Sequence, residues 1–310
     1  MKVVSLLPSA TEILCAVGGE DLLVGRSHEC DVPSTIADRP VLTAARTMGE
    51  SSAAIDREVR TMLEAEEDPN PSLYHLDVDR LVELSPDVIL TQDLCDVCSI
   101  DLKTVRGAAA LMDPTPVIVS LNPDSVWDVF DDLLRVGDAV GRGPESQAAM
   151  VAAREAYWSA VDYVNPYVPG PEILFLEWMD PPFVGGHWTP AMIEHAGARH
   201  SLNAAGQKSR VATPDEIVEA APDRVVICPC GYRIADIQRE LDALRGQSWW
   251  SELPAVREGD ENAIMLVDGN LMFNRPGPRL VDAFRWLVAW INDRPELHPE
   301  GFPAVPIDRS

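Results

Sequence analysis

Lysine is nearly missing from this chain. Only Lys2, Lys103 and Lys208 occur among the 310 residues, and all other basic residues are arginines. With 50 acidic residues against 25 basic ones, the formal net charge is -25. A field of that sign repels nucleic acids and anionic membranes, so we expect neither as a partner. An acidic, lysine-poor surface suits a solvent of high salt, where screening removes the self-repulsion, and we interpret the composition as halophile-like.

Long hydrophobic runs are missing as well. No stretch approaches the roughly 20 apolar residues of a membrane-spanning helix. The apolar start, MKVVSLLPSATEIL, contains several polar residues and is not followed by a small-residue cleavage site. We therefore expect a cytoplasmic protein without membrane insertion, whose six cysteines are reduced. In that compartment, closely spaced cysteines are more often metal ligands or redox groups than disulfides.

Several catalytic signatures are absent too. The sequence contains no Walker-type phosphate loop, no Gly-x-Gly-x-x-Gly, no His-Glu-x-x-His and no Gly-x-Ser-x-Gly. No combination of nucleophile, base and orienting group stands out. We expect no catalytic residue and favour a binding protein over an enzyme.

What the sequence does contain is an alternation of short apolar runs with helical patterns, which predicts α/β lobes with parallel sheets. Ser9 and Glu12 have the spacing of a capping box, so a helix is expected directly after the first strand. The predicted strands cover residues 2–7, 22–26, 87–92, 116–120, 172–177, 223–228 and 263–268. Further helices are predicted at 51–66, 77–84, 124–140 and 143–164, and from Thr189, Thr213 and Pro278 onward.

The two halves repeat one unit. Residues 77–92 and 213–228 align without a gap, and both predict a capped helix, a Pro-Asp turn and a buried strand. Two lobes joined by one long helix leave a cleft between them. We expect an N-terminal lobe at 1–142, a connecting helix at 143–165 and a C-terminal lobe at 166–310.

Residue types that are suited to ligand binding follow directly after the predicted strands. The carboxyl ends of parallel strands are the usual ligand-facing edge of such sheets. Aromatic side chains there would supply flat apolar contacts, and histidine, asparagine and arginine would supply polar or axial ones. The candidate ligand-binding residues are His28, Glu29, Gln92, Glu177, Trp178, His187, Trp188, Tyr232, Asn270, Asn274 and Arg275.

Five cysteines lie at the same strand ends and form a second candidate set. Thiolates are soft ligands that suit zinc or an iron–sulfur cluster. Packing thiols, a redox pair and thiols that touch a bound ligand are the alternatives. The candidate metal ligands are Cys30, Cys95, Cys98, Cys228 and Cys230, whereas Cys15 is expected in the core.

Other residues of these types are expected to be structural. The remaining histidines have no partner at ligand spacing. A pair of tryptophans in the C-terminal half is expected in the hydrophobic core. These residues are His75, His195, His200, His298, Trp249 and Trp250.

Several segments resemble the cobalamin and iron-siderophore solute-binding proteins of ABC transporters. They are SLLPSATEIL, GRSHECD, LSPDVILTQ, FLEWMDPPFVGGHW, APDRVVICPCG and VDGNLMFNRPGPRLVD, and the similarity covers nearly the whole chain. The resemblance implies two Rossmann-like lobes bridged by one rigid helix, with an iron chelate or a corrinoid held between them. It is closest to a signal-less subgroup of that family, which argues against a permease partner.

Our leading hypothesis is a monomeric cytoplasmic binding protein that holds a corrinoid or another metal complex between its lobes. The alternative is a metalloprotein or enzyme with a cysteine-ligated zinc ion or iron–sulfur cluster in the cleft. A third possibility is a scaffold or regulatory partner that has kept the fold with a closed cleft.

Overall fold

The computed structural model describes residues 1–64, 73–93 and 100–307. The chain divides into two compact units. The first consists of residues 1–50, 54–123 and 127–154, and the second of residues 51–53, 124–126 and the chain from Glu155 onward. No helix in the described ranges is both long and apolar enough to cross a lipid bilayer.

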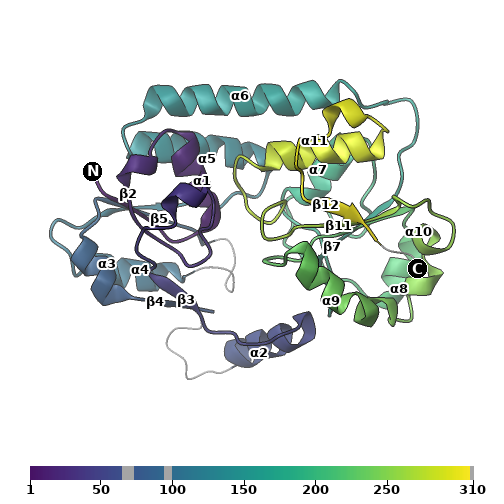
Figure 1. The fold of residues 1–310 in the computed structure, drawn as a ribbon, viewed down its shortest axis with the longest axis horizontal. Helices are drawn as coiled ribbons and strands as arrows, with labels where there is room; N and C mark the ends of the chain where they lie inside the picture. Colours follow the sequence, from purple (N-terminus) through teal and green to yellow (C-terminus); the bar gives the residue numbers. More distant parts are fainter. Residues whose placement is uncertain (65–72, 94–99, 308–310) are drawn as a thin grey trace. The chain divides into compact units, whose positions relative to one another are not determined.

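The first unit is built on a four-stranded parallel sheet (Figure 1). Its strand order is β2 (Leu23–Arg26), β1 (Val3–Ser5), β5 (Val88–Thr91), β6 (Val117–Ser120). A separate antiparallel pair consists of β3 (Thr43–Ala45) and β4 (Tyr74–Leu76). The helices are α1 (Pro8–Ala16), α2 (Ser52–Glu64), α3 (Val78–Leu84), α4 (Leu102–Ala109) and α5 (Val126–Ala139), with short 3₁₀ turns at Glu20–Leu22 and Ser34–Ile36. The first residues of α2 (Ser52 and Ala53) and of α5 (Val126) belong to the second unit.

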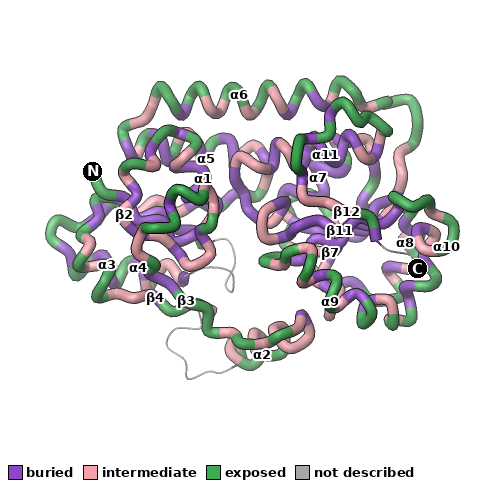
Figure 2. The backbone as a smooth tube through the Cα atoms, in the orientation of Figure 1, coloured by how far each residue is buried: buried purple, intermediate pink, exposed green. Residues whose placement is uncertain are grey.

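Alternate strand residues of this sheet enter two different cores. Val3, Val88 and Leu90 pack with residues of α1 and α5, whereas Val4 and Ile89 pack with residues of α3 and α4. The split follows from the two-residue period of a strand, and helices on both faces are why the central strands β1 and β5 are buried throughout. Figure 2 shows these strands as buried backbone.

The second unit has a six-stranded mixed sheet. Its centre is parallel, and its edges are antiparallel. The strand order is β12 (Ala304–Pro306), β11 (Ile264–Val267), β10 (Arg224–Ile227), β7 (Ile173–Trp178), β8 (Phe183–Val184), β9 (Arg210–Val211). The helices are α7 (Thr189–His195), α8 (Pro214–Ala220), α9 (Ile234–Arg245), α10 (Pro254–Arg257) and α11 (Leu280–Ile291), with 3₁₀ turns at Trp250–Glu252 and Pro295–Leu297.

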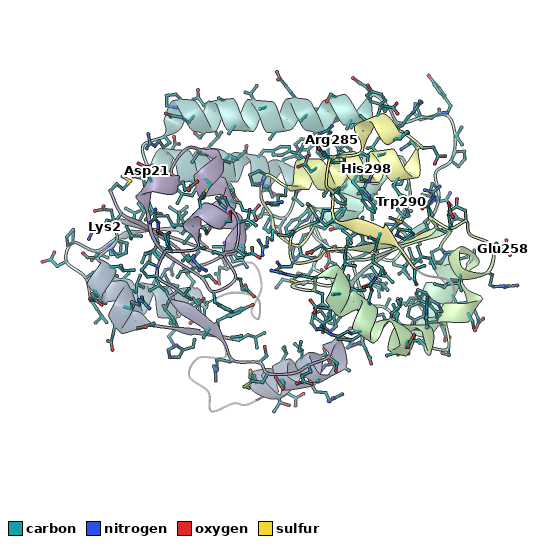
Figure 3. The ribbon with its side chains drawn as sticks, in the orientation of Figure 1. Lys2, Asp21, Glu258, Arg285, Trp290 and His298 are labelled. Carbon is teal, nitrogen blue, oxygen red and sulfur yellow. The ribbon has the colours of Figure 1, made fainter. Side chains whose placement is uncertain are left out.

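The repeat predicted from the sequence is confirmed in the backbone. Ser85 and Ala221, at equivalent positions, both end a helix in the left-handed region, with φ of 48° and 47°. In the first unit the carboxylate of Asp87 accepts the backbone N–H of Lys2 at 2.7 Å, at the start of β1, where Figure 3 labels Lys2. In the second, the carboxylate of Asp223 accepts the backbone N–H of Glu172 at 2.8 Å.

The predicted α/β class and the predicted strands and helices are confirmed, but one detail of the first helix is wrong. Ser9 and Glu12 form no capping box, because the N-cap of α1 lies two residues earlier, at Leu7, which makes no side-chain bond. Pro8 takes the first helical position, where its missing N–H has no helical acceptor to lose. Ser9 is therefore buried inside the first turn.

The helix predicted at 143–164 is α6 (Gly143–Val161). At about 1.5 Å per residue it is a single rod of roughly 28 Å. The division between the two units falls within it, after Arg154.

Replacing Ala221 by glycine should raise the free energy of unfolding of the second unit by about 0.5–1 kcal/mol, because its positive φ strains a residue with a Cβ. The matched control is Ala243→Gly, at an exposed interior position of α9, which should lower the same free energy by about 0.5–1 kcal/mol. Chemical denaturation measures both. Equal signs for the two variants would contradict the assignment of Ala221.

Candidate functional site

The loops after three central strands of the second unit are bonded to one another. The backbone N–H of Cys230, after β10, donates to the carbonyl of Glu177 in β7 at 3.1 Å. The backbone N–H of Asn270, after β11, donates to the carbonyl of Tyr232 at 3.0 Å. Gly269 must be glycine, because a Cβ there would lie 2.0 Å from the carbonyl oxygen of Pro229. The carboxyl edge of this sheet is therefore one connected surface.

Trp178 and Tyr232 form an aromatic pair on this edge. Their rings lie 5.3 Å apart with an interplanar angle of 66°, and both residues are partly exposed. The Tyr232 hydroxyl donates to Oε1 of Glu240 at 2.8 Å, and the indole N–H of Trp178 donates to the carbonyl of Ser52, in the same unit, at 3.1 Å. Because their polar atoms are engaged with the protein, the pair offers apolar ring surface.

Three other predicted ligand-binding residues are engaged inside the protein. Trp188 is buried, and its indole N–H donates to the carbonyl of Phe273 at 2.8 Å. Asn274 donates from Nδ2 to the carbonyls of Cys228 and Gly269, at 2.9 and 3.1 Å. The carboxylate of Glu177 accepts bonds from the protein on both oxygens. These contacts support the edge from within.

A buried polar group stands at the end of β11. Arg275 is 6% exposed and donates from Nη2 to Oδ1 of Asn270 at 3.0 Å. Asp268 is also buried, which raises the pKa of its carboxyl group, while Arg233 and Arg275 act in the opposite direction. Asn270 is partly exposed, so it is the member of this group that can meet a ligand.

His187 has an unusual backbone and an unusual side chain. Its φ is 50°, a region that non-glycine residues adopt only when their surroundings enforce it. The ring stacks on Trp188 at 5.6 Å, and Nδ1 lies 3.6 Å from Oδ1 of Asp124. Within the described ranges, this buried Nδ1 has no hydrogen-bond partner. Burial lowers the pKa of His187, so its imidazole is neutral at pH 7.

The first unit places His28 in a network of hydroxyl groups after β2. Nδ1 of His28 lies 2.6 Å from Oγ1 of Thr43, which also accepts the backbone N–H of His28 at 3.0 Å. The ring lies 5.3 Å from that of Tyr74, whose hydroxyl donates to Oε1 of Glu29 at 2.9 Å. Burial lowers the pKa of His28, and the carboxylate of Glu29 opposes this shift.

The cysteines lie in different environments. Cys30 is buried in the core of the first unit, and its Sγ accepts a bond from Oγ1 of Thr11 at 3.1 Å. Cys228 is fully buried in the second unit, and burial raises the pKa of its thiol well above the usual value, which favours the protonated form over a thiolate ligand. Cys230 is exposed. The residues whose positions are described contain no group of three or more His, Cys, Asp or Glu that could hold a metal ion. Cys95 and Cys98 lie outside those residues, so the cysteine site stays a prediction.

The tryptophan pair, Cys15 and His200 are structural, as predicted, whereas the role of Gln92 as a ligand contact stays a prediction. Gln92, at the end of β5, is buried. Trp249 and Trp250 belong to the core of the second unit, and Cys15 packs against the core of the first. His200 is buried, with Nδ1 2.9 Å from the carbonyl oxygen of Ile173.

Sequence reasoning missed the partners of the candidate residues. Thr43 and Tyr74 lie on the small β3–β4 pair, and Glu240 lies on α9. Each is a common residue type with no motif around it and meets its partner only through the fold. No signal in a single sequence could have singled them out.

Glu177→Gln should flatten the pH dependence of stability of the second unit. Burial raises the pKa of Glu177 from 4.5 to about 7. The Glu177 carboxyl group therefore binds its proton more tightly in the folded state than in the unfolded state. Its contribution to the free energy of unfolding is complete below pH 4.5 and is lost as the pH rises through 7. Between pH 5 and pH 8 the free energy of unfolding should fall by about 2 kcal/mol more in the wild type than in Glu177→Gln.

Denaturant titrations at the two pH values measure this difference. The matched control is Glu219→Gln, at an exposed position of α8, which should keep the wild-type slope. A Glu177→Gln slope equal to that of the wild type would contradict the assignment.

Comparisons with known proteins find structural likeness alone. No protein-family model matches the sequence. No curated protein matches it either.

Several solved structures share the fold over nearly their whole length. The periplasmic heme-binding protein RhuT from Roseiflexus sp. RS-1, in its apo form, has a TM-score of 0.70 at 18% identity, covering 94% of this chain and 98% of that one. A periplasmic heme-binding protein from Pseudomonas aeruginosa has a TM-score of 0.68 at 18% identity, covering 99% and 95%. The periplasmic vitamin B12-binding protein BtuF of Vibrio cholerae has a TM-score of 0.66 at 16% identity, covering 94% and 96%.

These values confirm the resemblance expected from the sequence. The chain has the fold of the two-lobed solute-binding proteins of ABC transporters that bind heme, vitamin B12 or iron complexes.

Proposed function

We propose that this protein is a solute-binding protein whose ligand is a flat metal complex, a corrinoid or a related metal chelate. The observation that carries the proposal is the geometry of His28, whose Nδ1 lies 2.6 Å from Oγ1 of Thr43 and whose backbone N–H donates to the same oxygen. The proposal is supported by the aromatic pair of the second unit and by the ligands named for proteins of the same fold.

We assign the ring proton of His28 to Nδ1, with the Thr43 hydroxyl as donor to Ser27. The Thr43 hydroxyl donates its single proton to Oγ of Ser27, at 3.0 Å. Its oxygen accepts the backbone N–H of His28, so the contact with Nδ1 is satisfied when Nδ1 carries the proton. The lone pair of the ring is then on Nε2. In the part of the chain that the structure describes, no hydrogen bond to Nε2 is formed, and Nε2 is not among the buried polar atoms without a partner.

A histidine in this state can serve as an axial ligand of a metal ion. Metals bind the neutral imidazole, and a bond from the other ring nitrogen fixes the orientation of the ring. The lowered pKa of His28 keeps the ring neutral at pH 7, so a metal ion does not have to displace a proton. His28 would thus donate Nε2 to the open axial position of a bound iron or cobalt complex.

The second unit, taken by itself, also offers groups that suit such a ligand. Trp178 and Tyr232 offer aromatic surface for a macrocycle. Asn270 offers a polar side chain to amide or carboxylate groups at its rim, and the buried Arg275 orients it. The cytoplasmic location, the monomeric state, the absence of a permease partner and a position between the lobes stay predictions.

Titration with hemin, cobinamide and cobalamin tests the proposal. We expect at least one of them to bind with a shift of its visible absorption, and His28→Ala to weaken binding by about 10-fold or more and to remove the axial spectral change. The matched control is His75→Ala, an exposed histidine of β4 in the same unit. Absence of binding by both absorbance and calorimetry for all three compounds would refute the proposed ligand class.

The cysteine hypothesis has its own test. Elemental analysis after anaerobic purification should find zinc or iron well below one atom per chain, because the buried thiols of Cys30 and Cys228 are engaged with Thr11 and Met272. Brown colour with broad visible absorption would indicate an iron–sulfur cluster instead. A stoichiometric metal content lost on Cys230→Ser would replace the proposed function with the metalloprotein alternative.

A further inference from the structure

Two segments of the second unit are hydrogen-bonded to each other beside β7. The presenting segment, residues 185–189, carries His187 and Trp188, and the crossing loop covers residues 203–209. The backbone N–H of His187 donates to the carbonyl of Gln207 at 2.6 Å, and that of Gly206 donates to the carbonyl of His187 at 2.8 Å. Nδ2 of Asn203 donates to the carbonyls of Gly185 and Lys208, both at 3.0 Å.

The contact between these segments is too close for a side chain. A Cβ at Gly186 would lie 2.3 Å from the backbone nitrogen of Ser209 and 2.7 Å from the carbonyl oxygen of Gln207. The next residue, His187, has a φ of 50°. A strained conformation of this kind persists only where the surrounding structure enforces it. The presenting segment therefore needs an anchor.

Glu177 bonds to all parts of this arrangement. Oε1 accepts the backbone N–H of Gly186 at 3.3 Å and the hydroxyl of Thr189, the first residue of α7, at 3.4 Å. Oε2 accepts a short bond from the hydroxyl of Ser209 in the crossing loop. One side chain from the end of β7 thus ties together the presenting segment, the start of α7 and the crossing loop.

We infer that Glu177 is a positioning residue that fixes the backbone of His187 and the ring of Trp188 through its bonds to Gly186, Thr189 and Ser209. It meets no ligand itself, since both carboxylate oxygens are engaged. The inference rests on the proposed function only in its consequence for ligand affinity, because the geometry of the segment is measurable without a ligand.

The chemistry of the three donors predicts which substitutions keep the anchor. The backbone N–H of Gly186 can only donate, so the atom at the Oε1 position must accept. The Ser209 hydroxyl can donate or accept, so an amide nitrogen at the Oε2 position can donate to it. Glutamine satisfies both demands, whereas alanine loses all three bonds.

Hydrogen exchange of the ligand-free protein, followed by mass spectrometry of peptides spanning 183–211, tests the inference. Glu177→Ala should speed exchange of the presenting segment by about 10- to 100-fold, the loss expected for two or three hydrogen bonds at local opening. Glu177→Gln should stay within about 2-fold of the wild type, as should the control Glu219→Gln. Ser209→Ala removes one donor and should speed exchange of the presenting segment by about 5-fold. This variant keeps the test decisive if Glu177→Ala does not fold.

Two results would overturn the inference. One is wild-type exchange in both Glu177→Ala and Ser209→Ala, and the other is an equal increase in Glu177→Gln and Glu177→Ala. A ligand titration separates this inference from the proposed function. If hemin and the corrinoids bind, Glu177→Ala should lower the affinity by about 10-fold and Glu177→Gln should not. If none binds to the wild type, the proposed ligand class fails while the exchange data still decide the role of Glu177.

Discussion

The register between neighbouring parallel strands is the constraint on which the rest of the structure depends. In each unit an aspartate after a Pro-containing turn accepts the first backbone N–H of the neighbouring strand and donates its own N–H to the same residue. Asp87 does so with Lys2, and Asp223 with Glu172. This reciprocal pair aligns Val3 with Val88 and Ile173 with Arg224. Because a slip of one residue would turn every side chain to the other face, the pair also decides which side chains reach the carboxyl edge.

In each unit, considered by itself, the groups after the strands are held in neutral or internally satisfied states, although the chain as a whole is strongly acidic. Burial lowers the pKa of His28 and His187 and raises the pKa of Glu177 and Cys228. Uncharged imidazole and aromatic rings are poorly suited to a bare cation, which needs anionic ligands. Under the proposed function the metal instead arrives already bound in a macrocycle and needs one more donor.

The two units share the repeated helix, turn and strand but differ in the segments around them. In the first, β2 runs parallel to β1, and the residues after β2 form the hydroxyl network around His28. In the second, the antiparallel strands β8 and β9 extend the sheet beyond β7, and the segments next to them clasp each other over Glu177. The repeated helix, turn and strand thus form a common frame, and the residues outside it differ between the units.

The sequence by itself determined the elements and their repetition. Buried strands, proline-initiated helices and Pro-Asp turns leave local signals, since apolar runs, proline and the left-handed helix end depend on neighbours within a few residues. For that reason the positions of β5, β10 and α8 could be predicted closely. Local signals did not decide between two possible starts of the first helix. The helix begins at Pro8, so Ser9 is not the N-cap that the sequence predicts.

Only the tertiary structure decided what the candidate residues do. Trp188, Glu177, Asn274 and Cys228 have the residue types of ligand contacts, yet each is engaged with the protein. His28 is bonded to Thr43, fifteen positions away, and Tyr232 is bonded to Glu240. Burial and hydrogen bonding between distant segments set protonation, tautomer and exposure, and a one-dimensional pattern carries no information about them until the chain has packed.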